Sequence, residues 1–194
     1  MLKQNWFDRR LPIINKLLLT AIILINAYII LLPFLPKVSY EVSKFTSDTK
    51  SINTPEERKA IDRSKNHVVI PSMNLDEFIW VGNNEKLVNK GIWHIPHSST
   101  PDKGSNTVLV GHRFTYKNTA VLYHLDKVKT GDPITVAWDG KLYNYVVSES
   151  KIVKPSDVYV EDPTEDSILT IYTCNPVWST RERLVVVARL ESVE

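Results

Sequence analysis

The sequence predicts an all-β domain, built as a closed or nearly closed β-barrel with short helices, behind one N-terminal transmembrane helix. Three observations lead to this fold class. The first is an uncharged apolar run of 19 residues near the N-terminus. The second is a series of short segments rich in β-branched and aromatic residues, which fills the rest of the chain. The third is the turn-forming residues between these segments, with no regular alternation of helices.

The apolar run, residues 17–35, predicts the transmembrane helix. As a helix it is about 28 Å long, close to the roughly 30 Å hydrocarbon thickness of a bilayer. A cleaved signal peptide is the alternative, but the run exceeds a typical signal-peptide core and no A-x-A-like cleavage site follows it. The positive-inside rule predicts a cytoplasmic segment 1–16, a membrane anchor 17–35 and an extracellular remainder. The charges before the run are Lys3, Arg9, Arg10 and Lys16, opposed by Asp8.

The segment after the anchor, residues 36–65, is polar with no clear period, which predicts a stalk. Within it, Thr54 can cap a short helix, Pro55 suits the first helical position and Glu57 completes a capping box. Residues 66–194 then form the working domain, which we expect to be the β-barrel.

We expect seven or eight short strands in this domain, and seven segments are identified as strands. The pair Asp139-Gly140 is the strongest hairpin signal between two of them. Residues 120–128 are expected to form one or two helical turns, and residues 93–101 a loop. The predicted strands are residues 68–70, 77–81, 107–110, 134–138, 142–153, 168–173 and 184–190.

Composition excludes several kinds of protein. The 194 residues suit one globular domain with an appendage, and a formal net charge of +2 predicts no nucleic-acid partner. Cys174 is the only cysteine, so the chain has neither an intramolecular disulfide nor a cysteine-based zinc cluster. The spacing of the five histidines matches no metal-ligand signature. We therefore expect no metal and no cofactor.

Cys174 has the surroundings of a nucleophile. It ends a predicted apolar strand, and Pro176 shortly after it cannot continue the hydrogen bonding of a sheet. A cysteine in that place lies on rigid backbone at the rim of the domain, where a substrate can reach it. A thiol also needs a nearby base or cation to react at neutral pH. His112 ends another predicted strand beside Gly111 and is the candidate base.

Arg183 is the candidate donor for an oxyanion. An acyl-transfer site needs such a donor, and Arg183 stands at the start of the last predicted strand. An arginine in this position is usually a solvated charge, but beside a thiol it supplies a permanently charged donor. Arg181 is the fallback, expected on the same strand face two residues earlier.

Three motifs together resemble the sortase family. The stretch Thr170-Ile171-Tyr172-Thr173-Cys174 is similar to the sortase signature T-L-x-T-C, with isoleucine in place of leucine. Val110-Gly111-His112-Arg113 resembles the surroundings of the sortase histidine. Glu182-Arg183-Leu184-Val185-Val186 resembles the strand that carries the sortase arginine. The histidine precedes the cysteine by about sixty residues and the arginine follows it by nine, as in the family. The resemblance covers residues 68–190.

The resemblance implies an eight-stranded barrel and a two-step reaction. Cys174 would be the nucleophile, His112 the general acid and Arg183 the oxyanion and substrate clamp, while Thr173 would position the substrate backbone. The enzyme would cleave an LPxTG-like sorting signal of a surface protein between threonine and glycine, giving a thioacyl intermediate. An amine from a cell-wall peptide or a pilin lysine would resolve it. Trp178 would line the substrate groove or serve as a packing residue.

Further features of the sequence bear on the sortase subclass and on calcium dependence. We expect no second hydrophobic span after Leu190, which disfavours the pilin-polymerising type, and the pattern around Cys174 and residues 93–101 is nearer to the class D and E sortases. Calcium activation needs acidic residues from two loops. The loop before the cysteine strand contains Glu161, Asp162, Glu165 and Asp166, but the opposite loop offers little beyond Asp102. A solvated acidic loop is the interpretation we favour.

Two other functions fit the same residues. A membrane-anchored cysteine peptidase would use the same three side chains and hydrolyse its thioester. A non-catalytic surface β-barrel would bind or scaffold other molecules, with Cys174 as an inert core residue.

Overall fold

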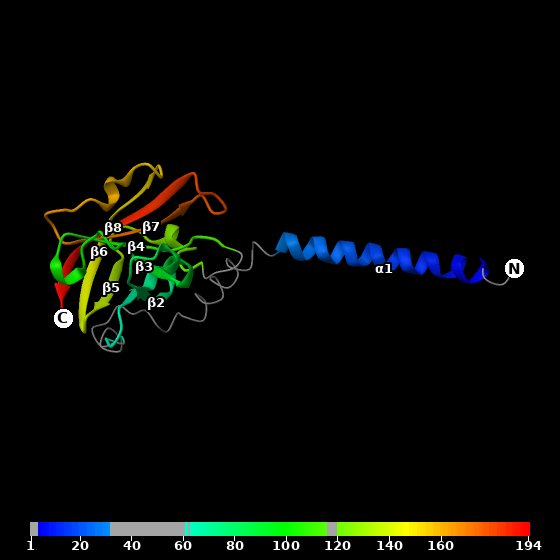
Figure 1. Ribbon diagram of the computed structural model, residues 1–194, viewed down its shortest axis with the longest axis horizontal. Coiled ribbons are helices and arrows are strands. Elements are labelled where there is room, and N and C mark those ends of the chain that lie inside the picture. The colour runs from blue at the N-terminus through cyan, green and yellow to red at the C-terminus, as the bar shows by residue number, and fades with distance from the viewer. Residues whose placement is uncertain (1–3, 32–60, 62, 116–119) are drawn as a thin grey trace. The chain divides into compact units, whose positions relative to one another are not determined.

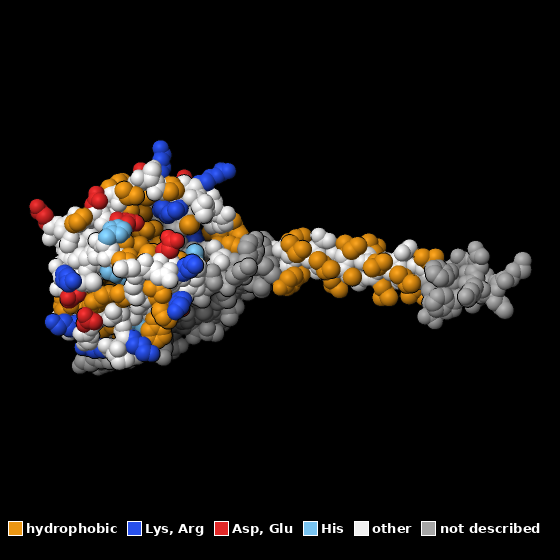
Figure 2. Space-filling model, viewed as in Figure 1, with side chains coloured by type: hydrophobic (Ala, Val, Ile, Leu, Met, Phe, Trp, Pro, Cys, Tyr) orange, Lys and Arg blue, Asp and Glu red, His pale blue; other side chains and the backbone are white. Residues whose placement is uncertain are grey.

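The computed structural model describes residues 4–31, 61, 63–115 and 120–194, which form one long helix and one β-barrel (Figure 1). The helix, α1, spans Gln4–Leu31. Its segment Leu11–Leu31 has a mean hydropathy of 2.1 and is long and apolar enough to cross a membrane, as a signal sequence would also be. Hydrophobic side chains are exposed along this segment (Figure 2).

The helix begins at Gln4, ahead of the predicted membrane segment, which starts at residue 17. Hydropathy locates the part of a helix that suits a bilayer, whereas backbone hydrogen bonding continues through the preceding charged residues. Residues 32–35 of the predicted anchor lie outside the described residues. So do most of the predicted stalk and the capping box from Thr54.

Eight strands close into a barrel in the order β1-β2-β3-β4-β7-β8-β6-β5, which confirms the predicted fold class. Strands β2 and β3 pair in parallel, as do β4 and β7, and the other neighbours are antiparallel. The strands are β1 (His67–Ile70), β2 (Leu75–Trp80), β3 (Ile92–His94), β4 (Asn106–Val110), β5 (Pro133–Trp138), β6 (Lys141–Val153), β7 (Ile168–Asn175) and β8 (Glu182–Val193).

All seven predicted strands are present, and β3 is the eighth. The prediction of a loop from Trp93 onward was wrong at its start, because Trp93 and His94 belong to β3 and pair with Val110 and Leu109 of β4. A strand of three residues is too short to show a period-2 pattern. Short 3₁₀ helices fill the connections: η2 (Pro71–Met73), η3 (Glu85–Lys90), η4 (Pro101–Lys103), η5 (Leu125–Lys127) and η6 (Val158–Glu161).

Two local predictions are confirmed by the backbone. Asp139 and Gly140 both have positive φ, 47° and 82°, and connect the paired residues Trp138 and Lys141 of the β5–β6 hairpin. This is the two-residue turn that suits strand twist. Residues 121–127 form turns followed by η5.

The barrel interior is filled by the inward-facing side chains of the strands. Val68, Val136, Leu109 and Leu169 are fully buried, and Ile171 is 1% exposed. This packing fixes where the strands end. The ends of β4 and β7 matter most, because these two strands run in parallel with Val110 opposite Tyr172. The residues that follow both strands therefore emerge at the same rim of the barrel.

Gly111 is the close packing point at this rim. A β-carbon there would lie 2.9 Å from Cγ2 of Val121 and 3.1 Å from Cδ1 of both Ile92 and Leu122. The amide of Leu122 also donates to the carbonyl of His112, at 3.1 Å. The turn after residue 120 therefore packs directly on the chain beside His112, and only glycine leaves room for it.

We predict that Gly111→Ala destabilises the barrel by about 1–3 kcal/mol, because the added methyl group overpacks a filled site. Chemical denaturation followed by tryptophan fluorescence would measure the change in unfolding free energy. Ser150→Ala, at an exposed position of β6, is the control, expected to change stability by less than about 0.5 kcal/mol. Equal stability of Gly111→Ala and wild type would contradict the packing described above.

Candidate active site

The candidate site lies at the rim where β4 and β7 end and β8 begins. The parallel register of β4 and β7 pairs Val110 with Tyr172, so His112 and Cys174 both follow by two residues. Strand β8 runs antiparallel to β7, with Arg183 opposite Cys174. Cross-strand neighbours of this kind have β-carbons about 4.5–5.5 Å apart. Sheet topology alone thus gathers three residues that are far apart in sequence.

Cys174 is partly exposed and is not a member of the hydrophobic core. Strand β7 continues one residue past it and ends at Asn175, because Pro176 has no N–H to donate. The thiol therefore lies near the end of a strand, on rigid sheet backbone, and remains accessible to solvent. The placement is what a nucleophile needs and differs from that of an inert core cysteine.

His112 lies two residues beyond the end of β4, whereas the sequence had placed it at the end of the strand. The close packing at Gly111 turns the chain out of the sheet. Nε2 of His112 lies 2.8 Å from Oδ1 of Asn89, on η3. An amide oxygen can only accept, so Nε2 is the donor and Nδ1 is the nitrogen left to take up or release a proton. Burial lowers the pKa of the imidazole, because it disfavours the charged form.

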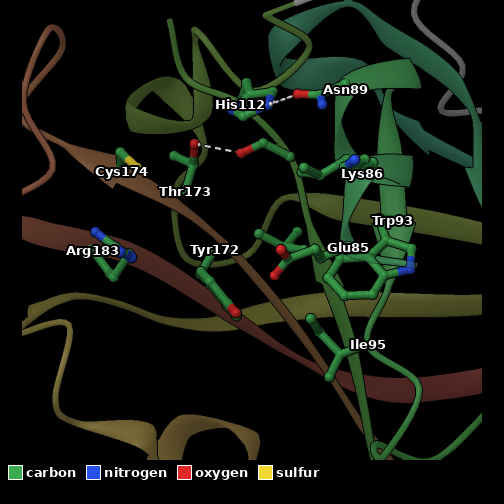
Figure 3. Close-up of a pocket in the computed structure, with 13 residues that line it drawn as sticks. Glu85, Lys86, Asn89, Trp93, Ile95, His112, Tyr172, Thr173, Cys174 and Arg183 are labelled. Carbon is green, nitrogen blue, oxygen red and sulfur yellow. Dashed lines mark hydrogen bonds between the residues drawn. The ribbon is translucent and has the colours of Figure 1, made fainter. Parts of the chain in front are cut away.

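Thr173 connects the two strand ends. It is buried, and its hydroxyl donates to the carbonyl of Gly111 at 2.8 Å (Figure 3). The side chain expected to contact the substrate backbone therefore has a partner within the chain, one residue before His112. Its direct contact with a substrate stays a prediction.

Arg183 is partly buried, and its Nη1 donates to the carbonyls of Thr180 and Glu182, each at 3.0 Å. The guanidinium has five N–H groups, so those on Nη2 and Nε are the ones that can bind a developing oxyanion. Arg181 precedes the first residue of β8, so the expectation that it shares a strand face with Arg183 was wrong. It lines neither of the hollows described next.

A first hollow of about 400 Å³ opens beside these residues. Figure 3 shows Cys174 and Arg183 near one end of it and Trp93 and Ile95 near the other. The hydroxyl of Tyr172, on its wall, donates to Glu161 at 2.7 Å. The hollow is lined by Glu85, Lys86, Val88, Asn89, Trp93, Ile95, Val110, Gly111, His112, Tyr172, Thr173, Cys174 and Arg183.

A second hollow of about 490 Å³ shares Asn89, His112 and Cys174 with the first. Trp178, in the loop between β7 and β8, lines it and is 49% exposed. Its ring centroid lies 3.6 Å from that of Phe114, so Trp178 both packs on a neighbour and borders the cysteine. Cys174 and His112 thus line both of two depressions of similar size.

Three of the other histidines, His67, His94 and His97, have partners away from the thiol. Nε2 of His94 lies 2.8 Å from the carbonyl of Ser99, and burial lowers the pKa of this ring. His67 pairs with Asp76, and His97 pairs with Glu161 at 2.7 Å. Glu161 belongs to the acidic loop considered for calcium, and it is engaged by His97 and Tyr172. Within the described part of the chain, no three His, Cys, Asp or Glu side chains are grouped as metal ligands.

Several residues of the site were not predicted from the sequence. Asn89 and Lys86 come from η3, whose start is capped by the side chain of Asn84 accepting from the amide of Lys86 at 3.0 Å. The sequence Gly82-Asn83-Asn84 had been taken only as a turn, although Asn84 before Glu85 is also a helix-capping signal. Tyr172, inside the quoted signature, had no role assigned.

Comparison with known proteins gives a consistent result. The sortase family, through its sortase domain, matches residues 68–191 of the chain. The chain is 28% identical over 158 residues to sortase A of Listeria monocytogenes, covering 77% of this chain and 70% of that protein. The solved structure of Listeria sortase A is similar with a TM-score of 0.60 and 28% identity, covering 69% of this chain and 90% of that chain.

Sortase C1 of GBS pilus island 1 is similar with a TM-score of 0.61 and 26% identity. That match covers 66% of this chain and 64% of the other, so the present chain aligns with less than two thirds of that relative's length. Since the matched relatives include both sortase A and sortase C1, the assignment to class D or E stays a prediction.

We predict that Asn89→Asp raises the pKa of His112. In the wild type, burial keeps this pKa below the ordinary value of 6.5, and a carboxylate at hydrogen-bond distance would favour the imidazolium. Titration of the imidazole Cε1–H signal by NMR measures both proteins. Asn89→Ala, which removes the contact without adding charge, is the matched control. A pKa of His112 that is unchanged or lower in Asn89→Asp would contradict the contact.

Proposed function

Because the chain belongs to the sortase family, we propose that it cleaves an LPxTG-like sorting signal and transfers the acyl part to an amine. Members of this family are cysteine transpeptidases of the cell surface. The observation that carries the proposal is the convergence of Cys174, His112 and Arg183 on one hollow at the barrel rim.

In the first step, the Cys174 thiol passes its proton to His112, and Sγ attacks the carbonyl carbon of the threonine in the Thr–Gly bond. The carbonyl electron pair moves onto oxygen, and the oxyanion accepts hydrogen bonds from Arg183. Collapse of this intermediate breaks the C–N bond, and the departing glycine amine takes the proton from His112. A thioester on Cys174 remains.

In the second step, an acceptor amine attacks the thioester carbonyl and gives a proton to His112. A new amide bond forms as the C–S bond breaks, and the proton returns to the sulfur. The acceptor is an amine of a cell-wall peptide or a pilin lysine. All protons exchanged in the cycle pass through one imidazole, which agrees with a ring whose Nε2 is already held by Asn89.

The two hollows support separate binding sites for the sorting signal and the acceptor amine. The first has apolar walls from Val88, Trp93 and Ile95, which suit the leucine and proline of a sorting signal. The second is lined by Pro176 and Trp178 in addition to Cys174 and His112, and we assign it to the acceptor amine. Because both contain Cys174 and His112, donor and acceptor can meet at the same thioester.

The helix α1 supports an anchor in the membrane. The excess of Lys and Arg before residue 17 favours a cytoplasmic N-terminus, which supports the proposal that the barrel lies outside the cell. Its substrates would then be surface proteins that carry a sorting signal.

Ligation of a peptide tests the proposal. The full chain in detergent micelles is incubated with an LPETG peptide and excess triglycine, and the products are measured by mass spectrometry. We expect the ligated LPET–triglycine product. Free LPET acid alone would indicate a peptidase, and no reaction together with a Cys174 that resists thiol reagents would indicate a binding barrel.

We predict that Cys174→Ala forms no thioacyl intermediate, because no other thiol is present in the chain. His112→Ala should lower kcat/KM by about 100-fold or more, the usual contribution of a general acid and base. Intact-mass measurement after mixing with the LPETG peptide detects the intermediate, and circular dichroism confirms that both variants fold. Ligated product formed by Cys174→Ala at a rate near that of the wild type would refute the assignment.

We predict that Arg183→Ala lowers kcat/KM by about 100- to 1000-fold, as loss of an oxyanion donor does. Arg181→Ala is the matched control, since Arg181 precedes β8 and lines neither hollow. It should stay within about twofold of wild type, as expected for an exposed charge away from the site. The opposite ranking of the two variants would show that Arg181 is the clamp.

A further inference from the structure

The three residues of the proposed triad are each adjacent in sequence to a residue of one hydrogen-bonded network, formed by Arg113, Asn175 and Glu182. Arg113 follows His112, Asn175 follows Cys174, and Glu182 precedes Arg183. Nη1 of Arg113 donates to Oδ1 of Asn175. The amide Nδ2 of Asn175 donates to Glu182 at 2.8 Å. The other end of the Arg113 guanidinium, Nη2, donates to Asp126 on η5 at 3.0 Å.

Arg113 is built into the protein and not free to sample solvent. Only 7% of its surface is exposed, in a residue type that is rarely buried unless paired. Its two terminal nitrogens are both committed to acceptors on different segments, one on β7 and one on η5. A buried charge with such partners is costly to unpair, so its geometry is firmly determined.

The backbone explains why this fixing matters. Cys174 and Arg183 face each other within a paired sheet, whose ladder holds them. His112 lies outside the ladder, because β4 ends at Val110; its carbonyl accepts from the amide of Leu122 and its ring contacts Asn89, but neither contact leads to β7. Two hydrogen bonds connect the residues on either side of His112 to β7, and we call them ties. The hydroxyl of Thr173 donates to the carbonyl of Gly111, and the guanidinium of Arg113 donates to the side chain of Asn175. Both ties lead to β7, one on each side of Cys174.

We propose that Arg113 is a positioning residue which, through Asn175 and Glu182, holds His112 in register with Cys174 and Arg183. The proposal rests on the proposed function, since it assigns a role within that reaction. The planar fork of arginine suits the task, because it donates in fixed directions to two acceptors at once. A lysine in its place keeps the charge but is a single mobile point donor.

Reversing the donor and the acceptor of the hydrogen bond between residues 175 and 182 tests the proposed network. In Asn175→Asp, the new carboxylate still accepts from Arg113 but faces Glu182 with like charge. In the double variant Asn175→Asp/Glu182→Gln, the amide of residue 182 donates to that carboxylate, so both contacts and the total charge return. We expect kcat for ligation to fall about 10- to 100-fold in the single variant, as small misplacements do, with KM within threefold.

The double variant should regain kcat to within about fivefold of wild type, which is the non-additivity that interacting residues show. Losses that simply multiply would overturn the proposal, since the two side chains would then act independently. Glu182→Gln alone completes the cycle. If Asn175→Asp and Asn175→Asp/Glu182→Gln have equal melting temperatures, the higher kcat of the double variant cannot come from greater stability.

Arg113→Lys separates positioning from stability. We expect kcat to fall about tenfold or more at a KM within threefold of wild type. The matched control is Val136→Ala, which leaves a cavity in the fully buried core of β5 and lowers the melting temperature without touching the site. Unchanged kcat in Arg113→Lys, or an equal loss of kcat in Val136→Ala, would overturn the proposal.

Alkylation of Cys174 by iodoacetamide distinguishes failure of this inference from failure of the proposed function, because it needs no peptide. If Arg113 positions the imidazole and guanidinium around the thiol, Arg113→Lys should react more slowly than wild type, on the order of tenfold. If Arg113→Lys is alkylated more slowly than the wild type but the wild type does not ligate the peptide, the sorting-signal reaction is refuted and the positioning role is supported. Equal alkylation rates alongside equal kcat would remove the positioning role alone.

Discussion

The parallel pairing of β4 with β7 is the constraint on which the site depends. With Val110 opposite Tyr172, the residues two positions later on each strand emerge together, and these are His112 and Cys174. Parallel neighbours cannot be joined by a tight turn, and here the whole stretch from residue 111 to 167 separates them in the chain. That stretch supplies β5, β6 and the acidic loop, so closing the barrel and assembling the site are one event. The antiparallel start of β8 then brings Arg183 opposite the cysteine.

Buried polar contacts continue this pairing beyond the sheet. Asn106, at the start of β4, donates to the carbonyls of Val160 and Asp162 and accepts from the hydroxyl of Thr170. The acidic loop is thereby held against the barrel, where Glu161 accepts from Tyr172 on the wall of the first hollow. Buried polar groups of this kind are stable only when they are paired. Their pairing therefore specifies the loop position, and with it the shape of the groove.

Sequence reasoning found the parts of this protein that local patterns encode. The β-rich segments, the Asp139-Gly140 turn and the barrel could be predicted because alternation and turn chemistry are short-range properties. Strand β3 was missed because three residues carry no periodicity. The cysteine, histidine and arginine could be named from motif order, but Asn89 and Arg113 could not, because their partners come from η3, η5 and β7. Contacts between segments far apart in the chain leave no mark in a single sequence.

The electrostatics of His112 suit the proposed reaction because of what the ring has to do in each step. A general acid that enters the reaction already protonated could serve the leaving amine but not the thiol. Burial disfavours the imidazolium in the resting protein, so a neutral ring is available to take the thiol proton first and to return it to the glycine amine afterwards. With Nε2 held by Asn89, only Nδ1 takes part, and a single nitrogen must serve the sulfur and both amines in turn. One nitrogen can do this only if the ring is held in a fixed place beside Cys174, which is why the ties on either side of His112 bear on the chemistry as much as on the fold.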